Sequence, residues 1–353
     1  MKKIIALVVL VLYAPFGFAC TTFLLSKDGQ HYFGRNYDWV TGNGMVLVNA
    51  RGLAKTSLPT GNGPQISWVS EFGSVTFNQY GKENPMGGMN EKGLVVELMW
   101  LEGTQYPKED TRAALDVLQW VQYQLDCSET VEEVVQSDKK VRIANRGNTP
   151  LHYLVADATG AAATIEFLNG KIVVHRGSDL PYPVLTNTVY ADALKRTGDP
   201  AQNNNRRFTD NSVERFATAC AMVTKYKDPA TEAAPVDYAF SILNNVAQGD
   251  FTRWSIVYDI SNKGIHFITH NRRERKSLSF SDLNFSCINP PIAFPLTSSV
   301  SGNIGPSMKA ITAAENRAIL EQSVQESSRI LTISKEEVDK VAAYFSAAKC
   351  SVK

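Results

Sequence analysis

The sequence predicts an α+β protein in which stacked antiparallel sheets are covered by helices. Strand-like runs rich in β-branched and aromatic residues occupy the early part of the chain, and similar runs return near the middle and again late. Between these groups lie two pairs of segments whose apolar residues have helical spacing. This order of strand groups and helix pairs favours a layered α+β design.

The first element of the chain is a short leader. The chain starts with Met1-Lys2-Lys3, and residues 4–13 form an unbroken apolar run before small residues that end at Ala19. This pattern predicts a signal peptide over residues 1–19 that export removes, because the run is too short for a permanent membrane anchor. We therefore expect a periplasmic or secreted protein whose mature chain begins at Cys20.

Three interpretations of Cys20 are compatible with this leader. A mature N-terminal cysteine carries a thiol and a free α-amine on one Cα, so it can act as a nucleophile with its own base. A leader followed by cysteine is also the layout of a bacterial lipoprotein, although Gly17 stands where a Leu-like residue is usual. The third interpretation is an ordinary disulfide cysteine. The leader alone does not choose between them.

The composition is typical of a globular protein. Of the 353 residues 44% are hydrophobic and 20% are charged, and the formal net charge is +1. The length suits one large domain or two ordinary ones. The chain has no basic stripe, so we expect no nucleic-acid partner. No apolar run after Ala19 approaches membrane-spanning length, so we expect no membrane span.

The remaining cysteines do not form a metal-binding pattern. They are widely spaced and include no CxxC pair, so no metal site is expected. Some of them can pair in an oxidising compartment, but the spacing leaves the pairing open. These residues are Cys127, Cys220, Cys287 and Cys350.

A hairpin opens the mature chain. Residues 21–26 are β-branched and apolar, residues 27–29 (Lys-Asp-Gly) predict a tight turn, and a return strand begins near residue 31. The turn brings Arg35 and Asp38 back beside Cys20. A guanidinium there would lower the thiol pKa, and a carboxylate could hold the α-amine. The alternative is an ordinary surface ion pair.

Further elements follow along the chain. Residues 87–94 predict a turn, and residues 111–125 and 128–135 predict two helices, the second capped by Ser128. Helices are also predicted over residues 210–223 and 236–246. The predicted strands are 95–100, 151–156, 162–168, 171–175, one that ends at Asn187, and a late hairpin of 253–259 with 264–269.

The tail has a different pattern. Residues 310–331 are helix-rich, and Ser334 with Glu337 predicts a capping box that opens a last helix to about Ala348. We predict a helical C-terminal extension over residues 306–353, packed on the main domain or on a partner subunit.

Six short motifs then occur in the order of one known family. They are Cys20-Thr21-Thr22-Phe23, Gly34-Arg35-Asn36-Tyr37-Asp38, Gly88-Met89-Asn90-Glu91-Lys92-Gly93-Leu94, Val184-Leu185-Thr186-Asn187, Glu214-Arg215-Phe216 and Thr252-Arg253-Trp254-Ser255-Ile256-Val257-Tyr258-Asp259. The chain resembles the choloylglycine hydrolase family, which contains conjugated bile salt hydrolases and penicillin V acylases. The resemblance covers about residues 20–285. The leader and the tail look like its Gram-negative exported branch.

The resemblance implies a fold and a reaction. The fold would be the N-terminal-nucleophile hydrolase fold, an αββα four-layer sandwich, with the amidase domain over residues 20–305. The reaction would be hydrolysis of a linear amide C–N bond through an N-terminal cysteine thioester, without a metal or organic cofactor. The expected partner is a small-molecule amide with an apolar acyl group.

The resemblance also implies roles for single residues. Cys20 matches the nucleophile and Arg35 the arginine beside it, while Asp38 matches the aspartate that holds the α-amine. Asn187 matches the asparagine whose side-chain amide helps to form the oxyanion hole. Arg215 matches an arginine that braces the site.

Two departures from the family pattern stand out. Trp100 occupies the position that family members fill with Asn or Tyr, so only its backbone N–H could serve an oxyanion. The segment between Asn187 and Arg215 is shorter than in Gram-positive members, where it helps to assemble tetramers. This departure puts the usual tetramer in doubt, and the oligomeric state, a homo-oligomer included, remains open.

Aromatic side chains are candidates for binding the acyl group. Trp39 and Trp100 are the first candidates, and Tyr37 and Tyr106 are weaker ones, with a packed core aromatic as the alternative for each. A Cys/His dyad is not expected, because no histidine lies in a matching motif. The ordinary packed or surface interpretation therefore holds for His31, His152, His175, His266 and His270.

The substrate remains open at this stage. Penicillin V is the first choice, and conjugated bile salts and N-acyl homoserine lactones are alternatives, because all present an apolar acyl group on a secondary amide. A non-catalytic lipoprotein acylated at Cys20 is a different class of alternative. A ceramidase-like amidase would normally need a propeptide before its cysteine.

Overall fold

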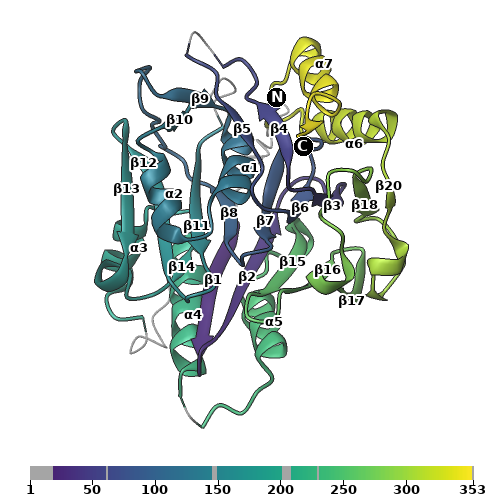
Figure 1. Ribbon diagram of the computed structural model, residues 1–353. Helices are drawn as coiled ribbons and strands as arrows, with labels where there is room; N and C mark the ends of the chain where they lie inside the picture. Colours follow the sequence, from purple (N-terminus) through teal and green to yellow (C-terminus); the bar gives the residue numbers. More distant parts are fainter. Residues whose placement is uncertain (1–18, 61–62, 145–148, 201–207, 229, 352–353) are drawn as a thin grey trace, which may run out of the picture.

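A computed structural model describes residues 19–60, 63–144, 149–200, 208–228 and 230–351. In this part of the chain two large sheets stack on each other, and helices cover their outer faces (Figure 1). The predicted α+β class and the αββα layering are confirmed. The predicted signal peptide lies, except for Ala19, outside the described residues.

The first large sheet has the strand order β14-β1-β2-β15-β16-β17-β19. Adjacent strands of this sheet pair antiparallel, except β17 and β19, which pair parallel. The bounds are β1 Thr21–Lys27, β2 Gln30–Asp38, β14 Val184–Leu185, β15 Thr252–Asp259, β16 Gly264–Thr269, β17 Arg272–Ser279 and β19 Gly302–Asn303.

The second large sheet has the order β13-β12-β11-β8-β7-β6-β3-β18-β20. Its bounds are β3 Met45–Asn49, β6 Ser74–Asn78, β7 Pro85–Asn90, β8 Val95–Trp100, β11 Leu151–Ala156, β12 Ala162–Leu168, β13 Lys171–Arg176, β18 Ile292–Pro295 and β20 Lys309–Ala310. Two small sheets join β9 Ala113–Leu115 to β10 Val141–Ile143, and β4 Leu53–Thr56 to β5 Ser67–Val69 and β21 Lys349–Cys350.

Aromatic packing fills the space between the two sheets. Phe77 of β6 lies edge-on to Tyr258 of β15 and Phe267 of β16, with ring centroids 6.3 and 5.4 Å away. All three side chains are buried. Such edge-to-face contacts between large rings are a favourable way to pack two sheets.

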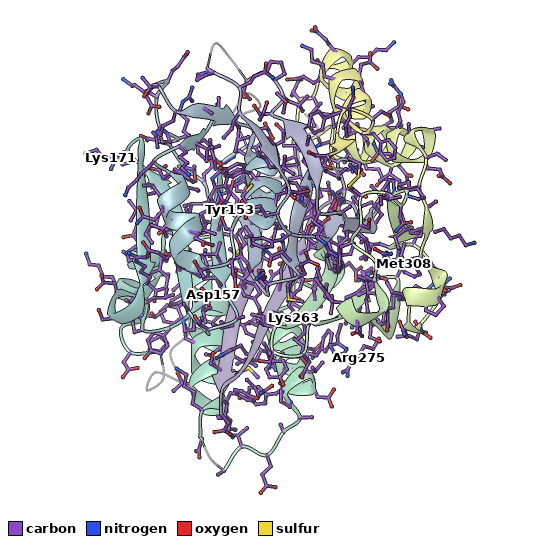
Figure 2. All side chains as sticks on the ribbon, in the orientation of Figure 1. Tyr153, Asp157, Lys171, Lys263, Arg275 and Met308 are labelled. Atoms are coloured by element: carbon purple, nitrogen blue, oxygen red, sulfur yellow. A yellow bond between two sulfur atoms is a disulfide. The ribbon has the colours of Figure 1, made fainter. Side chains whose placement is uncertain are left out.

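Helices form the outer layers. Helix α1 (Val117–Cys127) packs on β7 and β8 and α2 (Val131–Ser137) on β12, while α4 (Asn211–Tyr226) packs on β1 and α5 (Pro235–Asn245) on β2 and β15. Helix α3 (Tyr190–Thr197) packs on α4. Tyr153 of β11, labelled in Figure 2, packs against Trp120 of α1 with ring centroids 4.5 Å apart and the rings tilted by 43°.

The predicted first hairpin is confirmed. Strands β1 and β2 pair antiparallel with Thr22 opposite Arg35. Asp28 and Gly29 form the turn with φ of 53° and 72°, the left-handed values that a two-residue hairpin loop requires. This local chemistry fixes the register and returns Asp38 to the end of β1 where Cys20 lies.

Two helix starts differ from the prediction. The predicted helix over 111–125 begins only at Val117, because residues 113–115 pair as β9 with β10 and Asp116 caps the helix. The following helix is capped by Thr130, not Ser128, since Thr130 forms the capping box with Glu133.

The predicted turn over residues 87–94 is also wrong in part. Gly87 and Gly88 lie inside β7, and the turn is confined to the residues before Gly93, whose φ is 93°. A side chain at Gly87 would collide with the carboxylate of Glu97 on β8, so a glycine there gives that carboxylate its space.

The C-terminal extension contains two helices, α6 (Ala313–Glu326) and α7 (Lys335–Tyr344), at the upper right of Figure 1. The capping box of Ser334 and Glu337 is confirmed, but α7 ends at Tyr344, short of the predicted Ala348. Within the described residues, no helix combines the length and apolarity needed to cross a bilayer.

Candidate active site

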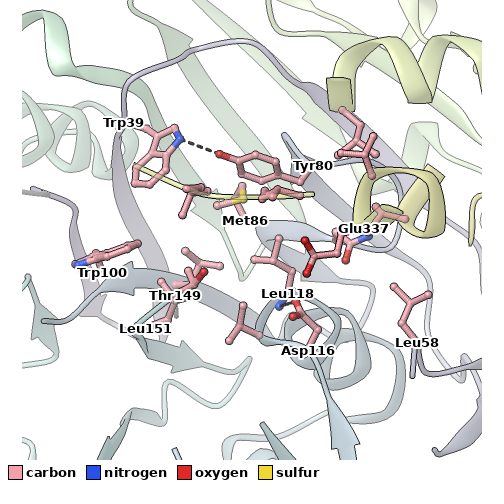
Figure 3. Close-up of a pocket in the computed structure, with 18 of the residues that line it drawn as sticks. Trp39, Leu58, Tyr80, Met86, Trp100, Asp116, Leu118, Thr149, Leu151 and Glu337 are labelled. Carbon is pink, nitrogen blue, oxygen red and sulfur yellow. Dashed lines mark hydrogen bonds between the residues drawn. The ribbon is translucent and has the colours of Figure 1, made fainter. Parts of the chain in front are cut away.

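Four of the predicted site residues line a cavity of about 200 Å³ where β1 begins and β2 ends, whereas Arg35, Asn187 and Arg215 are not among its lining residues. Cys20, Asp38, Trp39 and Trp100 all line it, and most of the other lining side chains are apolar. Figure 3 shows Trp39 and Trp100 on one side of this cavity. The structure thus brings a thiol, a carboxylate and two indoles from the predicted set to one space, and their roles stay predictions.

Cys20 is buried directly before β1. Its Sγ donates a long hydrogen bond of 3.9 Å to the backbone carbonyl of Asp38. Burial raises the pKa of the thiol, and the nearby Arg35 guanidinium opposes this rise without cancelling it. The expectation of a lowered thiol pKa is therefore wrong for this chain, in which Ala19 is still joined to Cys20. A thiol of this kind needs a base before it can attack.

The two carboxylate oxygens of Asp38 differ in their hydrogen bonding. Oδ1 accepts a hydrogen bond from the Thr252 hydroxyl, whereas Oδ2 is buried and has no hydrogen-bond partner among the described residues. Burial raises the pKa of Asp38 to about 7, although Thr252 and two arginines favour the ionised form. A buried oxygen without a partner is rare and suits a cation that docks there.

Arg35 connects the two large sheets. Its guanidinium forms a buried ion pair with Glu97 of β8 and donates to the Met86 carbonyl at 2.8 Å. Tyr258 donates to the same carboxylate at 2.5 Å. Glu97 was not recognised from the sequence, because its partner lies on a strand of the other sheet and no spacing rule links the two.

Asn187 and Arg215 form a single hydrogen-bonded unit next to Cys20. The Asn187 amide nitrogen donates to the Trp100 carbonyl at 2.7 Å, and its oxygen accepts from Arg215 at 2.9 Å. Arg215, at the start of α4, also donates to the Cys20 carbonyl at 2.5 Å and to the Thr21 hydroxyl at 2.7 Å. One hydrogen of the Asn187 amide therefore remains for another acceptor.

The two indoles form an aromatic corner. Trp39 and Trp100 have ring centroids 6.1 Å apart, and the Trp39 N–H donates to the Tyr80 hydroxyl at 3.0 Å, the dashed line in Figure 3. Tyr37 lines the cavity too. Tyr106 is not among the lining residues and instead bonds the backbone of Leu151, so the packing interpretation holds for it.

One histidine lies closer to the site than the sequence suggested. His152 is fully buried in β11, with one ring nitrogen 2.7 Å from the Thr186 carbonyl and the other 3.1 Å from Glu166. Glu166 also accepts the backbone N–H of Tyr190. These contacts hold both ends of the segment that carries Asn187, so His152 is a packed residue with a positioning contact.

The cysteine pairing is resolved by the structure. Cys287 and Cys350 form a disulfide, while Cys20, Cys127 and Cys220 are free. Among the described residues, no three acidic, histidine or cysteine side chains are grouped to hold a metal ion.

Comparison with known proteins agrees with this geometry. Residues 20–195 match the family described as linear amide C–N hydrolases, choloylglycine hydrolase family. This chain belongs to the choloylglycine hydrolase family. The family predicted from the motifs is therefore confirmed, while assignment to an exported Gram-negative branch stays a prediction.

Two curated members of the family are similar in sequence. Penicillin V acylase of Pectobacterium atrosepticum is 32% identical over 203 residues, 52% of this chain and 53% of that protein. Bile salt hydrolase/transferase of Clostridium perfringens is 29% identical over 180 residues, 48% of this chain and 53% of that protein. The chain thus aligns with about half the length of these relatives.

Two solved structures of family members share the fold. Penicillin V acylase from Agrobacterium tumefaciens superposes with a TM-score of 0.71 at 24% identity, covering 83% of this chain and 98% of that one. A variant of the conjugated bile acid hydrolase from Clostridium perfringens gives 0.67 at 18% identity, covering 80% and 98%. At these identities the likeness shows the fold alone, and it confirms the predicted N-terminal-nucleophile architecture.

Proposed function

We propose that this protein hydrolyses the linear amide bond of a small molecule with an apolar acyl group, using Cys20 as an N-terminal nucleophile once residues 1–19 are removed. The observation that carries the proposal is the buried Oδ2 of Asp38, which finds no hydrogen-bond partner in the described part of the chain and lies beside Cys20 at an apolar cavity. The α-amine released by cleavage becomes a cation when it is protonated, and such an oxygen would bind that cation.

The α-amine supplies the base that the buried thiol needs. Its ordinary pKa of about 7.7–8.0 lets it accept and return a proton near neutrality. In the first step it takes the proton of Cys20 Sγ, directly or through water, and the thiolate attacks the amide carbon. Asp38 holds the resulting ammonium, and the new positive charge favours the ionised carboxylate in turn.

Asn187 is suited to stabilise the tetrahedral intermediate. Its free amide hydrogen and a backbone N–H would donate to the oxyanion, and one such donor is worth about 2.7–4 kcal/mol of barrier. Arg215 positions this donor, because it binds the Asn187 oxygen and the Cys20 carbonyl at once.

The second half of the reaction regenerates the enzyme. The C–N bond breaks as the α-ammonium gives its proton to the leaving amine, which leaves Cys20 as a thioester. Water then attacks the thioester with the α-amine again as base, and the carboxylic acid and the free thiol are released. Every proton taken up is returned within the cycle.

The similarity to a penicillin V acylase supports penicillin V as the first substrate to test. Trp39 and Trp100 offer flat apolar surface beside the thiol, which suits the acyl part of such an amide. Conjugated bile salts and N-acyl homoserine lactones follow as candidates. The disulfide of Cys287 and Cys350 supports export to an oxidising compartment, periplasmic or secreted.

Burial of Cys20 argues against the lipoprotein alternative. A lipidated cysteine has to reach a membrane surface, whereas this residue is 4% exposed and its carbonyl is held by Arg215. Intact-mass analysis of the exported protein separates the two ideas. A chain that begins with an unmodified Cys20 supports the hydrolase, and an added diacylglycerol mass rules it out.

The activity test uses a panel of amides with two matched variants. We expect wild-type enzyme to release the amine from penicillin V, glycocholate, taurocholate or a long-chain homoserine lactone. Cys20→Ser should reduce turnover severely. Cys220→Ser should not, because Cys220 is a buried residue of α4 and does not line the cavity. Equal losses in both variants would mean that the wrong sulfur was chosen.

A further inference from the structure

We propose that the described part of the C-terminal extension, residues 306–351, forms the distal wall of the acyl cavity and sets which acyl chains fit. The ligand class that this cavity favours is the amide of an extended, unbranched aliphatic acid. This inference rests on the proposed hydrolysis at Cys20 and adds the identity of the acyl group.

The cavity runs from the nucleophile to the last helix. Figure 3 shows Trp39 and Trp100 at one end, Met86 and Leu118 near the middle, and Leu58 and Glu337 at the other end. Cys20 lines the same cavity as these residues, so one continuous space connects the thiol with α7. An acyl group that starts at Cys20 has to extend toward the extension.

The extension presents apolar side chains to this space. The distal wall consists of Leu320, Leu331, Ile333, Val338 and Val341. Apolar lining of this kind favours methylene groups, and each methylene buried contributes about 0.8 kcal/mol to transfer from water. An unfilled apolar space also costs stability, which a bound ligand would offset.

Charged side chains at the far end are already engaged by the protein. The Glu337 carboxylate accepts from the backbone N–H and hydroxyl of Ser334 in the capping box, and Lys340 pairs with Glu336 at 2.7 Å. An aliphatic tail needs no hydrogen bond from these groups. A hydroxylated ring system would need polar partners there, so the aliphatic chain fits better.

The extension is fixed to the main domain near both ends of the cavity. Near the indoles, the Ser327 hydroxyl lies 2.8 Å from the Tyr80 hydroxyl and accepts from the Trp39 N–H at 3.2 Å. At the far end, Tyr344 donates to the Thr56 carbonyl at 2.6 Å.

Covalent and sheet contacts complete this attachment. The Cys287–Cys350 disulfide joins the end of the extension to the main domain, and β21 pairs with β4. A wall held at several points cannot retreat easily, so it should impose a definite limit on chain length.

The test compares acyl amides that share one chromogenic amine and differ only in the acid, namely butanoyl, octanoyl and dodecanoyl. Val341→Phe should fill the distal end of the cavity. We expect kcat/KM for dodecanoyl to fall at least about tenfold relative to butanoyl, since one methylene in an apolar pocket is worth about 10–200-fold. Ala343→Phe is the matched control, because Ala343 is on the same helix, exposed and outside the cavity.

A second variant enlarges the cavity, so the test does not depend on the folding of Val341→Phe alone. Ile333→Ala should shift the preference toward longer acids. Ile319→Ala, in the same extension but packed in a separate apolar cluster around Met45 and Leu47, should leave it unchanged.

The outcomes separate this inference from the proposed function. If wild-type enzyme hydrolyses none of these amides nor any member of the activity panel, the proposed function fails. If it hydrolyses them but Ile333→Ala and Val341→Phe keep the wild-type chain-length profile, the proposed role of the extension fails. A wild-type preference for butanoyl over dodecanoyl would overturn the assigned substrate class.

Discussion

Replacing Arg215 with lysine should impair catalysis by releasing Asn187 from its orientation. The Arg215 guanidinium donates to four acceptors, on Asn211, Cys20, Thr21 and Asn187. Lysine offers one nitrogen on a flexible stem and cannot reproduce this fork. Because lysine carries a positive charge as arginine does, the substitution changes geometry more than charge.

The size of the effect follows from the contacts that remain. Removing the donor in Asn187→Ala should cost about 10²–10³ in kcat if Asn187 holds the oxyanion. In Arg215→Lys the Asn187 amide keeps its 2.7 Å bond to the Trp100 carbonyl, one of two side-chain anchors. We therefore expect a smaller loss in kcat, about tenfold to a hundredfold, or about 1.4–2.7 kcal/mol, with KM nearly unchanged.

A double-mutant cycle on one substrate tests this reasoning. Arg215→Lys should cost less in the Asn187→Ala background than in wild type, with a coupling of about 0.5–3 kcal/mol. Arg196→Lys, at an exposed ion pair with Asp210, serves as the control and should be silent. Effects that add within about 0.5 kcal/mol would refute the idea that Arg215 acts through Asn187.

Three further predictions concern buried groups. In a chain that retains Ala19, the free energy of unfolding should fall as pH rises from about 4 to about 7, because the pKa of Asp38 is higher in the folded chain than in the unfolded chain. Asp38→Asn should flatten this dependence of the unfolding free energy on pH, measured by urea denaturation. Glu97→Gln should lower the unfolding free energy by about 3–5 kcal/mol by stranding a buried guanidinium. His152→Gln should reduce kcat with little change in KM, and it should also lower the melting temperature because buried hydrogen bonds are lost. Half-buried His266→Gln should leave both kinetic constants unchanged.

Features determined by neighbouring residues were predictable from the sequence. The Asp28-Gly29 turn demands left-handed backbone, so both strands of the first hairpin and the return of Asp38 to Cys20 could be predicted. The capping box at Ser334 was equally local. The start of α1 was not, because residues before it pair with β10, and that long-range pairing overrides their helical spacing.

Contacts between layers could not be predicted in the same way. The pairing of Arg35 with Glu97 depends on how two sheets stack, and neither residue carries a local sign of the other. The same holds for Ser327, which meets Trp39 from the far end of the chain. The order of the motifs indicated the residues around the thiol. The opposite wall of the cavity comes from the C-terminal extension, whose sequence pattern indicated only helices.

Burial and the proposed cleavage together explain why the uncleaved chain, in which Ala19 is still joined to Cys20, would be inactive. With Ala19 still attached, burial favours the neutral thiol of Cys20 and raises the pKa of Asp38, so neither group presents a ready charge. Cleavage as proposed would add one basic nitrogen between them. As a neutral amine that nitrogen would accept the thiol proton, and the positive charge that it then carries would favour the ionised form of Asp38. The same burial that silences the precursor would then strengthen the charge interactions of the mature site, because water does not screen them.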